Sequence, residues 1–419
     1  MMKRQSFGII PGELLTPVSR VEPEKWACVA CDQYTSQPEY WEEAARLVGD
    51  APSCLKLVLP ECYLSEAAQR IPQIHREMAR CLQEGVFEAD TPECMMLLER
   101  TTQSGRRLGL VCLVDLENYD FTGVKSLVRP TEETITARLP ARLAVRREAP
   151  LESSHVMLLI DDAQRSVIEP LYERWKDSMD AYDFEAMQGC GHLRGKRISD
   201  PAELEGVQQA LSALAQGEEP LLFAVGDGNH SLATAKAHWL EVKAGLSPEE
   251  QQEHPARYAM AEVVNIHDPA LNFEPIHRVL LHVDAQELLA DWSAWCAARG
   301  MTLADTDAPG AQRFLFIAGG TEQEVFVHAP DDPLPVATLQ RYLDDYLARH
   351  AQAEIDYIHG DDVLRRLAEQ PERAGFLLPP LDKHAFFAAI DELGTLPRKT
   401  FSMGHAHEKR CYMECRRIR

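Results

Sequence analysis

The 419-residue sequence is 45% hydrophobic and 26% charged, close to the averages for globular proteins, which excludes a largely disordered chain. No apolar run approaches the about eighteen residues of a membrane helix, so we expect no membrane span. Forty-three basic and 66 acidic residues give a net charge of −23, and a field of that sign repels nucleic acid and anionic lipid. Because the N-terminus also lacks the apolar stretch of a signal peptide, we expect a cytoplasmic protein with reduced cysteines.

Apolar residues recur with periods of two and of about 3.6 along most of the chain, which predicts a mixture of strands and helices. The predicted strands cover residues 55–59, 94–98, 108–114, 155–160, 221–225, 261–266, 313–317, 324–328 and 375–378. The predicted helices cover residues 65–83, 131–147, 166–179, 201–215, 229–244, 285–298, 335–349 and 383–393. We therefore expect an α/β fold, or a mixed α+β fold, in which helices flank a mixed sheet.

Domain boundaries are weakly marked in the sequence. We place a main α/β domain over residues 1–280 and a smaller C-terminal α/β subdomain over residues 281–419, either separate or integral to the main domain. One helix start has clear chemistry, because Asp200 is a favoured N-cap residue and Pro201 suits the first helical position.

The most informative segment runs from residue 221 to residue 236, where an apolar strand meets a helix through a glycine turn. Gly226 and Gly228 permit positive φ and the close approach of a ligand, and Asn229 is a favoured N-cap residue. Free amides at a helix start, together with the positive end of its dipole, form a site for phosphate or carboxylate. Lys236 follows almost two helical turns after Asn229 and is expected on the same side. The segment therefore predicts an anion-binding turn.

Asp227 lies inside this turn, where its carboxylate would repel a bound anion. A divalent cation removes the conflict, because Mg²⁺ commonly bridges carboxylates and substrate phosphates. The alternative is a structural turn in which Asp227 and Asn229 only satisfy backbone amides. The density of Asp, Asn, His and Lys residues around the turn favours ligand binding.

The turn Gly-Asp-Gly-Asn-His-Ser at residues 226–231 resembles the Asp-Gly-His-His-Arg motif of the DUF1015 family, a domain of unknown function. Three other segments resemble family segments in the expected order: Arg-Pro-Thr-Glu-Glu-Thr at 129–134, Pro-Ile-His-Arg at 275–278 and Pro-Arg-Lys-Thr-Phe at 397–401. The family's turn is similar to that of the ParB and sulfiredoxin-like superfamily, which includes nucleotide-binding partition proteins and free-serine kinases.

The resemblance implies an enzyme that binds a phosphate or nucleotide at the turn and transfers a phosphoryl group to serine or a similar small hydroxyl metabolite. A phosphorylated small molecule is the expected partner, and a nucleotide and Mg²⁺ are the expected cofactors. The implied catalytic residues are Glu132 as base, Asp227 as Mg²⁺ ligand, and His230. The implied anion contacts are Gly226, Gly228, Asn229, Ser231, Lys236, His277 and Arg278.

Two departures from the family motifs support a second hypothesis. Ser231 stands at the arginine position of the turn, and Thr131 stands at the histidine position before Glu132. The alternative is a non-catalytic ligand-binding or sensor protein that keeps the pocket and has lost the chemistry. Nucleic-acid binding, by analogy with partition proteins, conflicts with the net charge.

Cysteines and histidines form two further groups. Cys28 and Cys31 have the spacing of a redox or zinc half-site, but no second pair of this spacing follows. At the C-terminus, His405, His407, Cys411 and Cys415 offer four zinc-type ligands, although their spacing matches no standard zinc module. A strand would instead bury the two cysteines on one face, so we expect no zinc. The sequence does not specify the oligomeric state.

Overall fold

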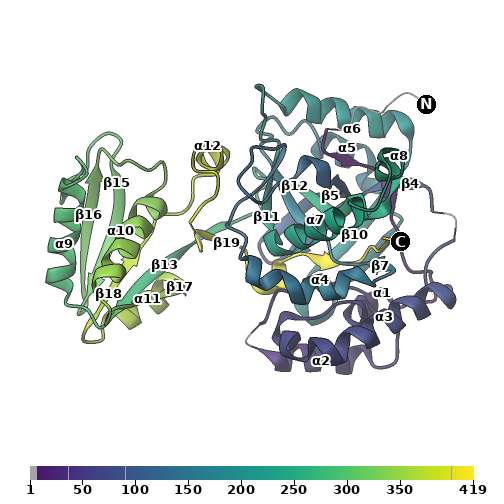
Figure 1. Cartoon of the computed structure of the whole chain (residues 1–419), viewed down its shortest axis with the longest axis horizontal. Helices are drawn as coiled ribbons and strands as arrows, with labels where there is room; N and C mark the ends of the chain where they lie inside the picture. Colours follow the sequence, from purple (N-terminus) through teal and green to yellow (C-terminus); the bar gives the residue numbers. More distant parts are fainter. Residues whose placement is uncertain (1–6, 36, 90, 398) are drawn as a thin grey trace. The chain divides into compact units, whose positions relative to one another are not determined.

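The computed structural model describes residues 7–35, 37–89, 91–397 and 399–419 (Figure 1). These residues form two compact units, one made of the chain up to Asn272 together with Gly404–Arg419, the other of Phe273–Met403. Both units mix helices with a sheet, which confirms the predicted fold class. A division into separate domains at residue 281 stays a prediction. In the described part of the chain, no helix has the length and apolar character needed to cross a membrane.

A ten-stranded mixed sheet forms the centre of the first unit. Its main path runs β6 (Val128–Pro130), β11 (Phe223–Asp227), β8 (Val156–Ile160), β12 (Tyr258–Asn265), β5 (Gly105–Asp115), β4 (Glu93–Thr102), β10 (His192–Ile198) and β9 (Tyr182–Glu185). Strands β1 (Ile9–Ile10) and β2 (Gly12–Glu13) pair with β5 and β4. The β11–β6 and β12–β8 pairs are parallel, and the remaining pairs are antiparallel.

Both faces of this sheet are buried because its long strands are apolar at successive positions. Along β4, Met96 and Leu98 enter one apolar core, whereas Met95 and Leu97 enter the other. The helices of the unit are α1 (Pro23–Trp26), α2 (Pro38–Val48), α3 (Ala67–Gln83), α4 (Leu139–Arg147), α5 (Glu169–Trp175), α6 (Pro201–Leu214), α7 (Asn229–Lys243) and α8 (Pro248–Glu253). Side chains of α1, α2 and α3 enter the first core, and side chains of α5, α6 and α7 enter the second.

The C-terminal segment returns to the first unit and pairs with strands from early in the chain. Strand β20 (Cys411–Tyr412) pairs with β3 (Cys28–Val29), and β21 (Arg416–Arg417) pairs with β7 (Leu151–Glu152). Residues that are almost the whole chain apart in sequence therefore meet in one core.

The second unit has a sheet in the order β14 (Thr302–Ala304), β16 (Thr321–His328), β15 (Gln312–Ala318), β18 (Arg373–Leu377), β13 (Phe273–Leu281) and β17 (Glu354–His359), with β19 (Phe401–Met403) on β13. Its helices are α9 (Ala285–Ala297), α10 (Pro335–Arg349), α11 (Asp361–Ala368) and α12 (Lys383–Leu393). Trp292 of α9 packs against Phe314, Phe376 and Tyr342 of α10. Leu364 of α11 joins a different apolar cluster.

Three local predictions are wrong for identifiable reasons. Residues 55–59 were expected to form a strand, but Cys54–Leu57 form a 3₁₀ turn capped by the Ser53 hydroxyl. The helix expected from residue 131 begins only at Leu139. Gly228, not Asn229, is the N-cap of α7, with φ at +93°. The Asp200 cap is confirmed, because its carboxylate accepts two amides of α6.

Candidate functional site

The glycine turn joins the carboxyl end of β11 to the start of α7. Gly228 has a positive φ of +93°, and a Cβ there would lie 3.0 Å from Cγ1 of Val156. Both features favour glycine, since an L side chain is strained in this conformation and the neighbouring strand leaves little space. A strand therefore meets a helix through the glycine turn, as the sequence predicts.

The parallel pairing of β6 with β11 brings the ends of these two strands together. Asn229 Oδ1 accepts the Thr131 amide at 3.1 Å, and its Nδ2 donates to Thr131 Oγ1 at 3.1 Å. The Thr131 hydroxyl in turn donates to the carbonyl of Val225 at 2.7 Å. The Asn229 side chain thus holds the end of β6 against the turn, and Glu132 is the next residue along the chain after Thr131.

His230 contacts the same loop. The amide of Ile135 donates to His230 Nε2 at 3.3 Å, so this nitrogen acts as acceptor and the neutral ring carries its proton on Nδ1. Burial, followed by the charges of Arg142 and Arg138, lowers the pKa of His230 to about 4. His230 is therefore neutral near pH 7 and can donate one hydrogen bond from Nδ1.

Two carboxylates meet at the buried side chain of Arg410, in the C-terminal segment. Arg410 Nη2 lies 3.0 Å from Asp32 Oδ2, and its Nη1 lies 2.5 Å from Asp227 Oδ2. The carboxylates are 22% and 17% exposed, whereas the guanidinium is fully buried. Burial raises the pKa of Asp32, but the charge of Arg410 and the hydrogen bonds from Gln33 and Arg410 together outweigh burial and lower the pKa overall. Asp32, Asp227 and Arg410 therefore form a cluster with one net negative charge.

The sequence did not identify Asp32 or Arg410 as site residues. Asp32 follows directly after Cys31, and Arg410 directly precedes Cys411. The antiparallel pairing of β3 with β20 brings these two segments together, and the Ala30 amide donates to the Arg410 carbonyl at 2.8 Å. No local pattern reveals such a pairing across the chain.

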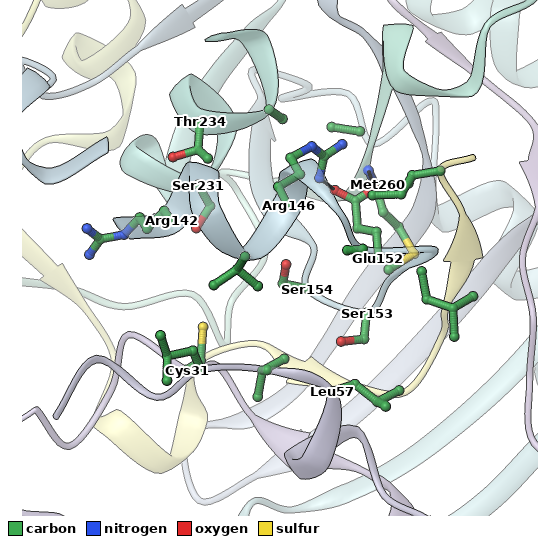
Figure 2. Close-up of a pocket in the computed structure, with 18 of the residues that line it drawn as sticks. Cys31, Leu57, Arg142, Arg146, Glu152, Ser153, Ser154, Ser231, Thr234 and Met260 are labelled. Atoms are coloured by element: carbon green, nitrogen blue, oxygen red, sulfur yellow. Dashed lines mark hydrogen bonds and ion pairs between the residues drawn. The ribbon is translucent and has the colours of Figure 1, made fainter. Parts of the chain in front are cut away.

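Helix α4 and the residue that precedes it carry two arginines that affect His230. Arg142 forms an ion pair with Glu61, and Arg138 is the residue preceding the helix. Arg142, Glu61 and Ser231 line one cavity (Figure 2). The start of α7 is therefore close to at least one guanidinium, and Ser231 faces a cavity.

The Lys236 ammonium has its hydrogen-bond partner in another part of the first unit. Its Nζ donates to the carbonyl of Leu116 at 2.8 Å, beside the carboxylates of Glu117 and Asp120. Burial lowers the pKa of this half-buried amine. The role of Lys236 as an anion contact stays a prediction.

His277 and Arg278 belong to β13 of the second unit. His277 Nδ1 accepts the Leu378 amide at 3.1 Å, and Nε2 lies 3.0 Å from Asp361 Oδ1. Arg278 is fully buried and donates from Nε to Gln340 Oε1 at 3.2 Å. The structure thus brings together the turn and the segment containing Glu132, while His277 and Arg278 have partners within the second unit. Their predicted phosphate contacts remain untested.

The cysteines of both sequence groups lie in the first core. Cys28, Cys411 and Cys415 are buried there. Burial, followed by the charge of Asp32, raises the pKa of the Cys31 thiol to about 12, which disfavours a thiolate nucleophile. The rings of His405 and His407 stack with their centroids 5.7 Å apart.

Several solved structures resemble the chain at low identity. A mutant of a free serine kinase in complex with AMP matches with a TM-score of 0.39 and 10% identity, over 74% of this chain and 92% of that chain. A conserved hypothetical protein from Pyrococcus furiosus matches with a TM-score of 0.34 and 10% identity, over 70% and 90%. C-terminally truncated SbnI from Staphylococcus aureus matches with a TM-score of 0.37 and 11% identity, over 72% and 85%. Similarity at this level says nothing about shared chemistry.

No curated protein matches the sequence significantly. The model of the DUF1015 family, described as a protein of unknown function, matches residues 15–346. This match covers most of the chain and confirms the family resemblance, and three of the four motifs lie within it. The segment at 397–401 lies beyond the match, and its residue 398 is outside the described part of the chain. The chain therefore belongs to the DUF1015 family.

Proposed function

We propose that the first unit binds a phosphate-bearing small molecule, such as a nucleotide, at the start of α7. The observation that carries the proposal is the convergence of a helix N-terminus, the neutral His230 and the charges of Arg138 and Arg142. The first amides of α7 would donate to phosphate oxygens, and the helix dipole adds favourable charge. His230 would contribute a further donor from Nδ1, and Ser231 a hydroxyl.

The carboxylates suit the transfer of a phosphoryl group to a small hydroxyl-bearing acceptor. The oxygens of Asp32 and Asp227, with one net negative charge beside Arg410, fit the ligand preference of Mg²⁺. Bound there, Mg²⁺ would neutralise charge on the phosphates. Glu132 would accept the proton of the acceptor hydroxyl. At the same time the hydroxyl oxygen would bond to phosphorus, and the bond between phosphorus and the donor oxygen would break.

A second candidate function is ligand sensing without catalysis. It is favoured by Arg410, whose guanidinium already bridges the two carboxylates. A protein that only binds its ligand needs no base and no free metal site. The two functions differ in turnover and share the binding site.

Isothermal titration with ATP, ADP, AMP and pyrophosphate, with and without Mg²⁺, tests the binding site. We expect saturable heat with at least one of these ligands, and the absence of heat with all of them would refute the proposal. ADP formation from ATP with small hydroxy acids as acceptors tests the reaction. Turnover that disappears in Glu132→Gln supports the enzyme, while binding without turnover supports the sensor.

A further inference from the structure

A cavity of about 110 Å³ lies in the first unit beside Ser231 (Figure 2). Much of its wall is aliphatic and comes from Leu57, Val58, Leu59, Met78, Val145 and Met260. An apolar cavity of about 150 Å³ accommodates benzene in another protein. Because the cavity beside Ser231 is smaller than that one, it limits a ligand to at most roughly six non-hydrogen atoms.

One part of the cavity wall is polar. Among the described residues, Ser153 Oγ and Arg146 Nε are buried without a hydrogen-bond partner, and both residues line the cavity. Figure 2 shows the Ser153 side chain turned toward the open space. A buried donor left without a partner is unfavourable, so a ligand that brings an acceptor would be favoured here.

A second guanidinium, that of Arg416, lies behind this wall without lining the cavity, and it makes the charge around Glu152 positive. Glu152 forms ion pairs with Arg146 and with Arg416, whose Nε lies 2.6 Å from Glu152 Oε2. Glu152 also accepts the amide of Met260 at 3.1 Å. Burial raises the pKa of Glu152, but the two arginines outweigh it and lower the pKa overall, so the carboxylate stays ionised. Two guanidinium groups against one carboxylate leave one buried positive charge, which an anionic ligand would balance.

We infer that this cavity binds a short branched aliphatic carboxylate. Its carboxyl group would accept from Ser153 and Arg146, and its aliphatic body would pack against Met78 and Met260. The other end of the molecule would face Ser231, at the start of α7. The assignment of this molecule as the phosphoryl acceptor, a short hydroxy acid, rests on the proposed function, whereas its binding in the cavity does not.

Titration of the protein with isobutyrate and with its neutral isostere isobutyramide tests the inference. We expect isobutyrate to bind at least about tenfold more tightly, because only the carboxylate balances the buried charge. The variant Ser153→Ala should weaken isobutyrate binding by roughly tenfold. The matched control Ser178→Ala, which removes an exposed hydroxyl of the same unit, should bind isobutyrate as the wild type does. Equal affinity for the two compounds, or wild-type affinity in Ser153→Ala, would overturn the inference.

A cavity-filling variant, Ala149→Leu, locates the site. It should abolish isobutyrate binding and leave pyrophosphate binding at the start of α7 unchanged. If this variant does not fold, the comparison of Ser153→Ala with Ser178→Ala still tests whether isobutyrate binds in the cavity. Isobutyrate binding without binding of any phosphate compound would refute only the proposed function, and the reverse result would refute only the cavity ligand.

Discussion

Burial and the charges of Arg142 and Arg138 lower the pKa of His230 to about 4. In the unfolded chain the His230 imidazole has a pKa of about 6.5. It therefore binds a proton there at pH values where the imidazole of the folded chain is still neutral. Stability from the neutral ring is present above pH 6.5 and is lost as the pH falls toward 4. After discounting for the partial exposure of the ring, we expect a loss of roughly 1–2 kcal/mol over this range.

Urea unfolding at pH 7 and pH 4.5 measures this effect. The wild type should lose more unfolding free energy on acidification than His230→Gln does, whereas His384→Gln, at an exposed position, should behave like the wild type. An identical pH dependence in the wild type and His230→Gln would show that the histidine is not held neutral.

Arg410 provides a second prediction for a single residue. Arg410→Gln leaves Asp32 and Asp227 without their shared counter-charge and should lower the unfolding free energy by about 3 kcal/mol. Arg417→Gln is the matched control, because Arg417 lies in the same segment and pairs with Glu13 at the surface. That change should cost less than about 1 kcal/mol. Chemical denaturation compares the two, and equal losses would contradict a special role for the Arg410 bridge.

Among the elements, the connection from β11 to α7 depends most on one residue. Gly228→Ala should lower stability by about 1–3 kcal/mol, because the added methyl is strained at φ of +93° and lies 3.0 Å from Val156. Gly123→Ala separates the backbone strain from the contact with Val156. At Gly123 φ is +99°, but no atom lies within 4 Å of the added Cβ. Denaturant midpoints should fall further for Gly228→Ala, and an equal fall would mean that the contact with Val156 contributes nothing.

Elements with strong local signals were predicted correctly. Helix α7 has a glycine before it and apolar residues at helical spacing, and α6 has the Asp200 cap and Pro201. The predicted helix start at residue 131 failed because Thr131 is held outside any helix by Asn229 and Val225. Strand β13 escaped prediction, since Pro275 and the charged motif that follows it interrupt its apolar pattern.

For the whole molecule, the sequence predicted the fold class and the family but not the residues that meet across the chain. Asp32 and Arg410 are 378 residues apart, and only the pairing of β3 with β20 brings them together. Of the segments that the sequence singled out, the turn and the segment containing Glu132 come together through the parallel pair β6–β11, and their role as a site stays a prediction. The cavity beside Ser231 could not be predicted, as its walls come from many separate segments.

The most direct test of the central claim is the titration of pyrophosphate into three proteins: the wild type, Arg142→Gln and Arg147→Gln. Both arginines lie on α4, but Arg142 lines the cavity beside Ser231, whereas Arg147 pairs with Glu241 at the surface. Binding at the start of α7 predicts that Arg142→Gln weakens affinity by on the order of tenfold, since a charge-assisted contact is lost, while Arg147→Gln has wild-type affinity. Equal affinity of all three proteins, or no binding by the wild type, would contradict the account.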